Sequence, residues 1–158
     1  MSFDLSIPAV ALVFLLLLSA FFSGSETALT AASRARLTEL ERRGNWRASV
    51  ALSLTKSRER LIGALLLGNN VVNISASALA TAVLLKAFGD SGAIIASVAM
   101  TVLVLIFGEV MPKTYAIAYP ERVALAVAPI MRVLVPVFGP VVIAVEYVVK
   151  NVLRVFGV

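Results

Sequence analysis

The sequence predicts an all-α membrane protein: three transmembrane helices plus juxtamembrane or interfacial helices, with the N-terminus outside and the C-terminus in the cytoplasm. Two observations support this fold class. Of the 158 residues, 60% are hydrophobic and only 15% are charged, with a mean hydropathy of +0.98, whereas soluble domains are roughly half apolar and a quarter charged. Long uncharged runs also alternate with short basic segments, which is typical of membrane spans and their cytoplasmic loops. We therefore expect one multi-pass domain over residues 1–158 in the inner or plasma membrane.

Each expected span is built on an uncharged run of roughly 20 residues, the length that crosses a bilayer. The first helix is expected at 5–32, continuing in the cytoplasm to about 43, just before a glycine stop signal at Gly44. The second and third spans are expected at 61–86 and 91–115, with a tight outer turn between them. Between Ser33 and Arg60, eight basic residues stand against three acidic ones. The positive-inside rule places this loop in the cytoplasm.

The last segment, 120–158, is apolar but interrupted. Arg132 lies near its middle, and Pro129, Pro136 and Pro140 break the expected helical hydrogen bonds. We therefore expect short juxtamembrane helices here. Farther on, one polar stripe recurs every fourth residue, typical of an amphipathic helix on the inner interface: Glu146, Lys150 and Arg154. The alternative is a fourth span, which would require the inverted orientation that the loop charges oppose.

Polar residues occur at similar depths in all three spans. At about 1.5 Å of rise per residue, Ser23 lies ~16 Å from Arg34, Asn70 ~15 Å from Arg60, and Glu109 ~19 Å from Arg122. Polar groups inside a membrane need partners, so three at one level predict a shared site. Ser19, four residues before Ser23, shares its helical face. Pro112 cannot donate to the carbonyl of Gly108, which frees another oxygen.

The chemistry of this site is that of oxygen ligands, because the chain has no cysteine and no histidine. Hydroxyl, amide and carboxylate oxygens suit a hard cation such as Mg²⁺, Ca²⁺ or Na⁺. Simpler interpretations stay open: serines that bond their own helix, asparagines that join helices, and an ion pair between Glu109 and Lys113. Whether three further residues join the site is also open: Glu26, Asn69 and Asn73.

Three ordered motifs resemble the transmembrane domain of the CorC and cyclin M (CNNM) magnesium transporters. They are Phe21–Ala28 (FFSGSETA), Leu67–Asn73 (LGNNVVN) and Phe107–Thr114 (FGEVMPKT). The resemblance implies a homodimer that exports Mg²⁺, with Na⁺ as a possible coupling ion. Carried onto this sequence, it gives the metal ligands Ser23, Asn70 and Glu109, with Ser19 and Gly108 nearby. It also implies cytoplasmic nucleotide-binding regulatory domains, which we expect to be absent from this chain.

Functions other than magnesium transport are compatible with the same sequence features. A membrane anchor or sensor without transport, or a Na⁺ or proton carrier using Glu109, would fit the same spans. We expect no enzyme, since no nucleophile and base are arranged together. The basic residues flank the spans, so the bilayer is the expected partner and nucleic acid is not.

Overall fold

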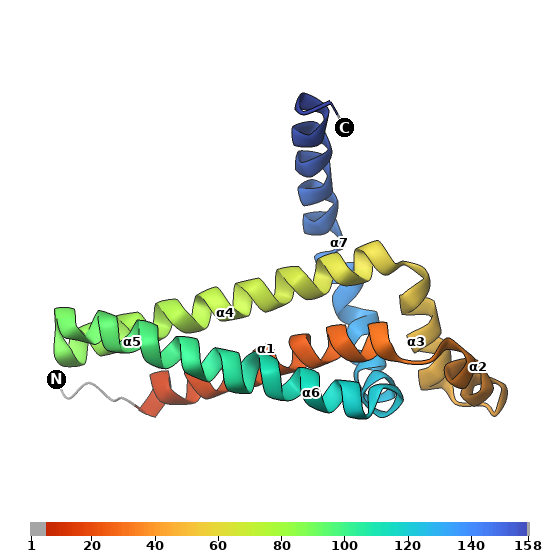
Figure 1. Cartoon of the computed structure of the whole chain (residues 1–158), viewed down its shortest axis with the longest axis horizontal. Helices are drawn as coiled ribbons and strands as arrows, with labels where there is room; N and C mark the ends of the chain where they lie inside the picture. The colour runs from red at the N-terminus through yellow and green to blue at the C-terminus, as the bar shows by residue number, and fades with distance from the viewer. Residues whose placement is uncertain (1–5, 158) are drawn as a thin grey trace.

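The computed structural model describes residues 6–157 and consists of helices throughout that range (Figure 1). The all-α prediction is therefore confirmed. In chain order the helices are α1 (Ser6–Ala31), α2 (Arg34–Arg42), α3 (Trp46–Lys56), α4 (Arg58–Phe88), α5 (Asp90–Leu103), the π-helix η1 (Val104–Val110), α6 (Met111–Ala118) and α7 (Pro120–Val155).

Three long rods form the body of the molecule. The rods α1, α4 and the continuous run α5–η1–α6 lie side by side along the longest axis (Figure 1). The hairpin between α4 and α5 turns at Gly89, whose φ of +66° favours glycine. A Cβ on Gly92 would collide with the Leu84 carbonyl oxygen. Glycine at this position thus lets the two rods approach closely, as in many membrane helix pairs.

The first helix ends earlier than the sequence suggested. It was expected to continue to about residue 43, but α1 stops at Ala31 and a separate helix α2 begins at Arg34. Ser33 causes the break, because its side chain accepts a hydrogen bond from the Arg36 N–H at 3.4 Å and so caps α2. Its own N–H donates to the Glu121 carboxylate at 3.4 Å. The expected start of the first span, at residue 5, lies outside the described residues.

The expectation of short helices over 120–158 was also wrong. Apart from Val158, which lies outside the described residues, this segment forms one helix, α7, with Pro129, Pro136 and Pro140 inside it. Each proline removes one backbone donor, and a membrane helix tolerates this where neighbouring groups compensate. By length and composition, α7 joins Ser6–Ala31, Arg58–Phe88 and Asp90–Ala118 as a fourth candidate span within the described residues. In Figure 1, however, α7 runs across the three rods and its C-terminal half projects away from them.

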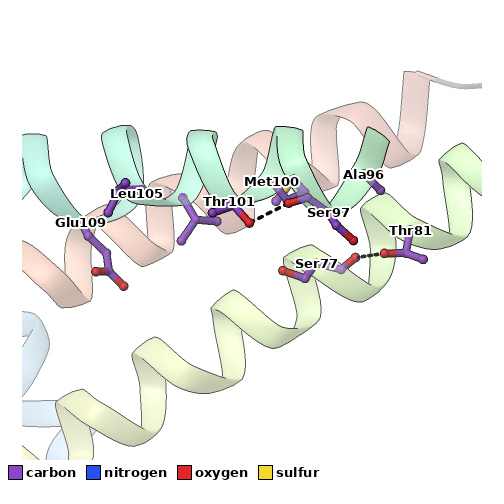
Figure 2. Close-up of a pocket in the computed structure, with 9 residues that line it drawn as sticks. Ser77, Thr81, Ala96, Ser97, Met100, Thr101, Leu105 and Glu109 are labelled. Atoms are coloured by element: carbon purple, nitrogen blue, oxygen red, sulfur yellow. Dashed lines mark hydrogen bonds between the residues drawn. The ribbon is translucent and has the colours of Figure 1, made fainter. Parts of the chain in front are cut away.

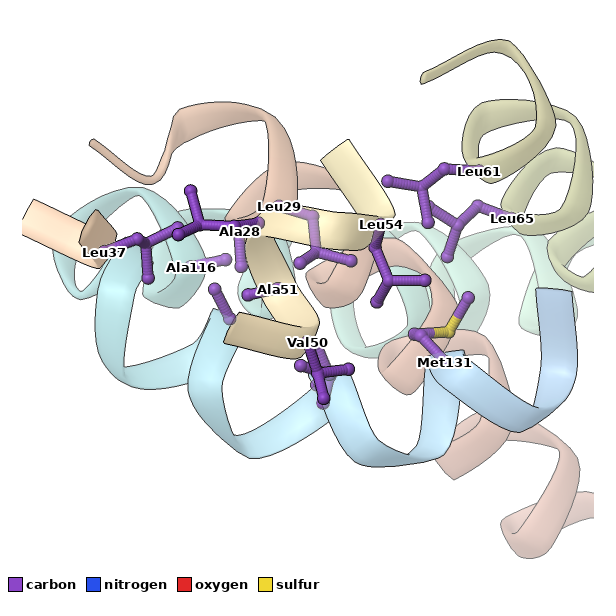
Figure 3. Packing of buried hydrophobic residues seen from close by; sticks show 14 of the residues in the cluster. Ala28, Leu29, Leu37, Val50, Ala51, Leu54, Leu61, Leu65, Ala116 and Met131 are labelled. Carbon is purple, nitrogen blue, oxygen red and sulfur yellow. The ribbon is translucent and has the colours of Figure 1, made fainter. Parts of the chain in front are cut away.

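The main hydrophobic core lies at the end of the rods where α1 finishes. There, α3 packs on α7, and both close over the last turns of α1 and the first turns of α4 (Figure 3). Leu37, Leu61 and Met131 are almost completely buried. The ends of α1 and α4 are therefore anchored in a packed base, which fixes their register where polar residues face each other.

Candidate cation site

A cluster of oxygen atoms joins α1 to α4 in the middle of the bundle. The Ser19 hydroxyl donates to Asn73 Oδ1 at 2.6 Å and lies 3.3 Å from Asn69 Oδ1. Asn73 Nδ2 lies 3.5 Å from Asn69 Oδ1. One hydroxyl proton thus serves two amide oxygens. Hydroxyl and amide oxygens gathered at one place are ligands that a hard cation accepts.

The structure places Asn69 and Asn73 beside Ser19, whereas the expected ligand Asn70 lies elsewhere. Asn70 is exposed and lines a cavity between α4 and the C-terminal half of α7, so the structure does not bring it to Ser19. Asn69 and Asn73 are four residues apart and share one face of α4, whereas Asn70 is turned by about 100°. The depth estimate could not separate neighbouring residues. In the sequence, the four-residue spacing of Asn69 and Asn73 is the signal that places these two residues on one helical face.

Ser23 lies one turn along the same face of α1 as Ser19. Its side chain is 0% exposed, and within the described residues its Oγ is a buried polar atom without a hydrogen-bond partner. Ser25 shows the usual alternative, because its hydroxyl donates to the Phe21 carbonyl at 2.6 Å. A buried hydroxyl left unpaired costs on the order of 1–3 kcal/mol. Ser23 is therefore a free ligand atom in the interior.

Gly108 brings the third rod against Ser19. A Cβ at Gly108 would lie 2.7 Å from Ser19 Oγ, so only glycine permits this approach. Gly108 sits in η1, where the helix widens and the Met111 N–H donates to the Ile106 carbonyl, five residues earlier. The widened turn ends at Val110, two residues before Pro112, which has no N–H to donate. Such π segments are rare and occur frequently at functional sites.

Glu109, the next residue in η1, is half-buried and points into the space between its rod and α4 (Figure 2). The alternative of an ion pair with Lys113 is not formed: among residues 6–157, the carboxylate that the structure pairs with a cation is Glu39, with Arg43 at 2.9 Å. The π turn offsets residues four apart, which removes the geometry that an α-helical pair needs. Glu26, on α1, is half-buried and likewise lies outside that ion pair.

The site has the composition of a weak, hard-cation site. Within the described residues, no three His, Cys, Asp or Glu side chains gather around one point. Ligands would come from the hydroxyls of Ser19 and Ser23, the amide oxygens of Asn69 and Asn73, and the Glu109 carboxylate. Such a set provides one full negative charge and several neutral oxygens.

Comparison with known proteins places the chain in a family. Residues 10–158 match the model of the cyclin M transmembrane N-terminal domain. The chain is 40% identical over 141 residues to the UPF0053 inner membrane protein YfjD of Escherichia coli strain K12, covering 89% of this chain and 33% of the relative. It is 37% identical over 156 residues to a UPF0053 protein of Haemophilus influenzae, covering 99% and 37%.

A further relative carries a functional name. The polyamine export protein of Haemophilus influenzae is 29% identical over 162 residues, covering 94% of this chain and 38% of that protein. The chain spans about a third of the length of these two UPF0053 relatives. With its long apolar helices and the family match over 10–158, the chain belongs to the cyclin M transmembrane domain family and is a multi-pass membrane protein.

Proposed function

We propose that this domain transports Mg²⁺ out of the cytoplasm through the oxygen cluster shared by α1, α4 and η1. The observation that carries this proposal is the unpaired, fully buried Ser23 hydroxyl, one turn from a serine whose proton serves two amide oxygens. An inserted cation would give every one of these oxygens a partner. Packing alone leaves Ser23 unsatisfied.

The proposed ligands differ in role. Ser19 and Ser23 present hydroxyl oxygens from α1, and Asn69 and Asn73 present amide oxygens from α4. Gly108 allows η1 to approach Ser19, and its carbonyl oxygen is a further candidate ligand. Glu109 provides the negative charge. Mg²⁺ prefers six oxygens in a tight octahedron and gives up water reluctantly, so several well-placed protein oxygens are needed to hold the largely dehydrated ion that we propose.

Charge balance favours transport over storage. One carboxylate leaves a divalent ion with one uncompensated positive charge, which keeps binding weak enough for release. Opposing movement of the α5–η1–α6 rod against α1 would open the site to one side and then to the other. A Na⁺ gradient is the proposed energy source, because the same hard oxygens accept Na⁺ when Mg²⁺ has left.

The proposed topology has three spans, with the N-terminus outside and α7 on the cytoplasmic interface. The transverse course of α7 supports this topology, because a helix that crosses the bundle cannot also cross the bilayer in parallel with it (Figure 1). The basic residues of α2 and α3 favour the cytoplasmic side for this end. The homodimer implied by the family resemblance stays a prediction.

A second candidate cargo is an organic polycation. One relative, 29% identical, is named a polyamine export protein. A polyamine carries several ammonium groups, and Glu109 can neutralise only one of them. The compact cluster around Ser19 therefore favours Mg²⁺ in this chain.

Flux measurements separate the candidates. Proteoliposomes loaded with Mg²⁺ or with spermidine would carry wild type or Glu109→Gln, which keeps the shape of the side chain and removes its charge. We expect Mg²⁺ flux in wild type and its loss in Glu109→Gln. Spermidine flux without Mg²⁺ flux would overturn the choice of cargo, and no flux of either would favour the anchor or sensor function. A Mg²⁺ flux that Glu109→Gln leaves unchanged would remove Glu109 from the site.

A further inference from the structure

A second polar feature lies between the proposed cation site and the α4–α5 turn. A cavity of about 430 Å³ is lined by α4, α5 and η1. Its lining includes four hydroxyl side chains, Ser77 and Thr81 from α4 and Ser97 and Thr101 from α5, together with Glu109. Figure 2 shows the hydroxyls of the two helices facing each other, with Glu109 toward one end. We call this cavity the hydroxyl cleft.

The α4 side of the hydroxyl cleft continues a row of polar residues that begins in the cation site. On α4, polar residues recur every fourth position through Asn69, Asn73, Ser77 and Thr81. Asn73, Ser77 and Thr81 also line one shared groove. Asn73 belongs to the oxygen cluster through its bond with Ser19. The α4 stripe therefore leads without interruption from the cluster toward the turn at Gly89.

Three of the four hydroxyls donate their protons within their own helices. Thr81 donates its proton to the Ser77 carbonyl at 2.8 Å, Ser97 to the Ala93 carbonyl at 3.0 Å, and Thr101 to the Ser97 carbonyl at 2.6 Å. Because each proton is used within its own helix, the lone pairs of these oxygens remain for other partners. Packing against lipid needs no such oxygens. The positions one residue farther on α5, Val98 and Val102, are exposed as Ser97 and Thr101 are, but they are apolar.

The space suits a hydrated ion. One water occupies about 30 Å³ in the liquid, so the hydroxyl cleft has room for on the order of ten waters. Mg²⁺ usually keeps several of its waters when it binds to protein. Hydroxyl lone pairs accept hydrogen bonds from those waters without stripping them from the ion.

We propose that the hydroxyl cleft is the outward half of the ion path, through which the cation leaves the Ser19 cluster while regaining water. This inference rests on the proposed function, since it assigns an exit to the same ion. It adds Ser77, Thr81, Ser97 and Thr101 as path-lining residues. Their oxygens accept hydrogen bonds from water while the ion exchanges the protein ligands of the Ser19 cluster for water molecules.

Because the sequence has no cysteine, a cysteine introduced in the hydroxyl cleft is the only thiol that a reagent can label. Single variants Ser97→Cys and Thr101→Cys would be treated in proteoliposomes with a charged, membrane-impermeant thiol reagent. The matched controls Val98→Cys and Val102→Cys lie one residue farther on the same helix. Thiolates form only where water reaches, so we expect the cleft positions to react at least about ten-fold faster, and Mg²⁺ to slow them.

Equal rates at cleft and control positions would overturn the hydroxyl cleft as a water-filled path. A spontaneous disulfide between two copies at Ser97→Cys would overturn it too, because the face would then be covered by protein. As a second readout, the double variant Thr81→Val with Thr101→Val should slow Mg²⁺ flux but keep the stabilisation of the protein by Mg²⁺. An unchanged flux would contradict the path.

Failure of the proposed function has a separate signature. Wild-type protein would then show neither Mg²⁺ flux nor stabilisation by Mg²⁺, whatever the cysteine rates. Failure of the inference alone would leave wild-type flux and stabilisation intact while the cleft cysteines stay unreactive.

Discussion

Ser23 and Ser25 stand two residues apart on α1, and both side chains are completely buried. Ser25 donates to the Phe21 carbonyl of its own helix, while the Ser23 hydroxyl has no partner within the described residues. The two residues present the same chemistry in the sequence. Which of them faces a neighbouring rod depends on the rotation of α1, and this explains why the motif alone assigned a role to Ser23 but could not demonstrate that its oxygen is free.

Ser23→Ala should change stability in opposite directions with and without Mg²⁺. Without the ion, removal of an unpaired buried hydroxyl should raise the free energy of unfolding, by about 1 kcal/mol. With Mg²⁺ at 100 times its dissociation constant, wild type should gain about 2.7 kcal/mol and the variant clearly less. Thermal unfolding in detergent measures both.

The control is Ser25→Ala, which should lose about 1 kcal/mol with its helix hydrogen bond and keep the full response to Mg²⁺. If Ser23→Ala lowers stability without Mg²⁺, its hydroxyl has a partner and the site loses its main support.

Gly68, one residue before Asn69 on α4, lies in the contact between α1 and α4. A Cβ there would lie 2.5 Å from the ring of Phe22, which is itself buried. Gly68→Ala should therefore destabilise the protein by about 1–3 kcal/mol, measured by thermal unfolding. Gly139→Ala is the matched control, because nothing lies within 4 Å of its added Cβ and alanine favours a helix by up to about 1 kcal/mol. Equal stability of the two variants would contradict the described packing of α1 on α4.

Among the elements, η1 shows what periodicity can and cannot predict. The uncharged run over 91–108 indicated a membrane helix, and Pro112 indicated a freed carbonyl. The widening of Val104–Val110 into a π-helix has no periodic signal of its own, although Gly108, which packs on Ser19, lies inside it. Likewise, the three prolines of α7 suggested breaks, but one helix persists from Pro120 to Val155. The sequence alone shows that each proline removes a backbone hydrogen bond. The residues packed around the proline decide whether the helix bends or breaks.

Pro112→Ala should act on η1 directly. The alanine restores a backbone N–H that can bond to Gly108 in an ordinary α turn, which would rotate Glu109 relative to α1. We expect unchanged or higher thermal stability together with a reduced Mg²⁺ flux in proteoliposomes. Thr114→Ala, two residues farther on, is the control and should keep the flux. A Pro112→Ala protein with wild-type flux would show that the π turn does not position the site.

For the whole molecule, the sequence predicted helices, membrane insertion and three apolar rods, because these follow from composition and run length. The sequence did not establish how α7 lies against the rods, since hydropathy counts it as a span as readily as the others. Its course across the bundle is a property of tertiary packing. The selection of Asn69 and Asn73 over Asn70 has the same origin, because it depends on the rotation of α4 against α1.

The three-span topology predicts a labelling pattern in intact cells. In this cysteine-free chain, Asp90→Cys at the outer turn should react with an impermeant maleimide added outside. Asn45→Cys in the basic loop and Phe156→Cys after α7 should both react only after the membrane is opened. Labelling of Phe156→Cys from outside in intact cells would show that α7 crosses the bilayer as a fourth span.

The central claim, that the Ser19 cluster binds the transported ion, is tested most directly by comparing neighbouring asparagines. Asn73→Ala removes the amide oxygen that lies 2.6 Å from Ser19, whereas Asn70→Ala changes an exposed residue on another face. Binding would be measured as stabilisation by Mg²⁺ in thermal unfolding. The described site predicts at least about a ten-fold weaker midpoint for Asn73→Ala, equivalent to ~1.4 kcal/mol, and a wild-type midpoint for Asn70→Ala. The reverse pattern, or equal midpoints in both variants, would contradict it.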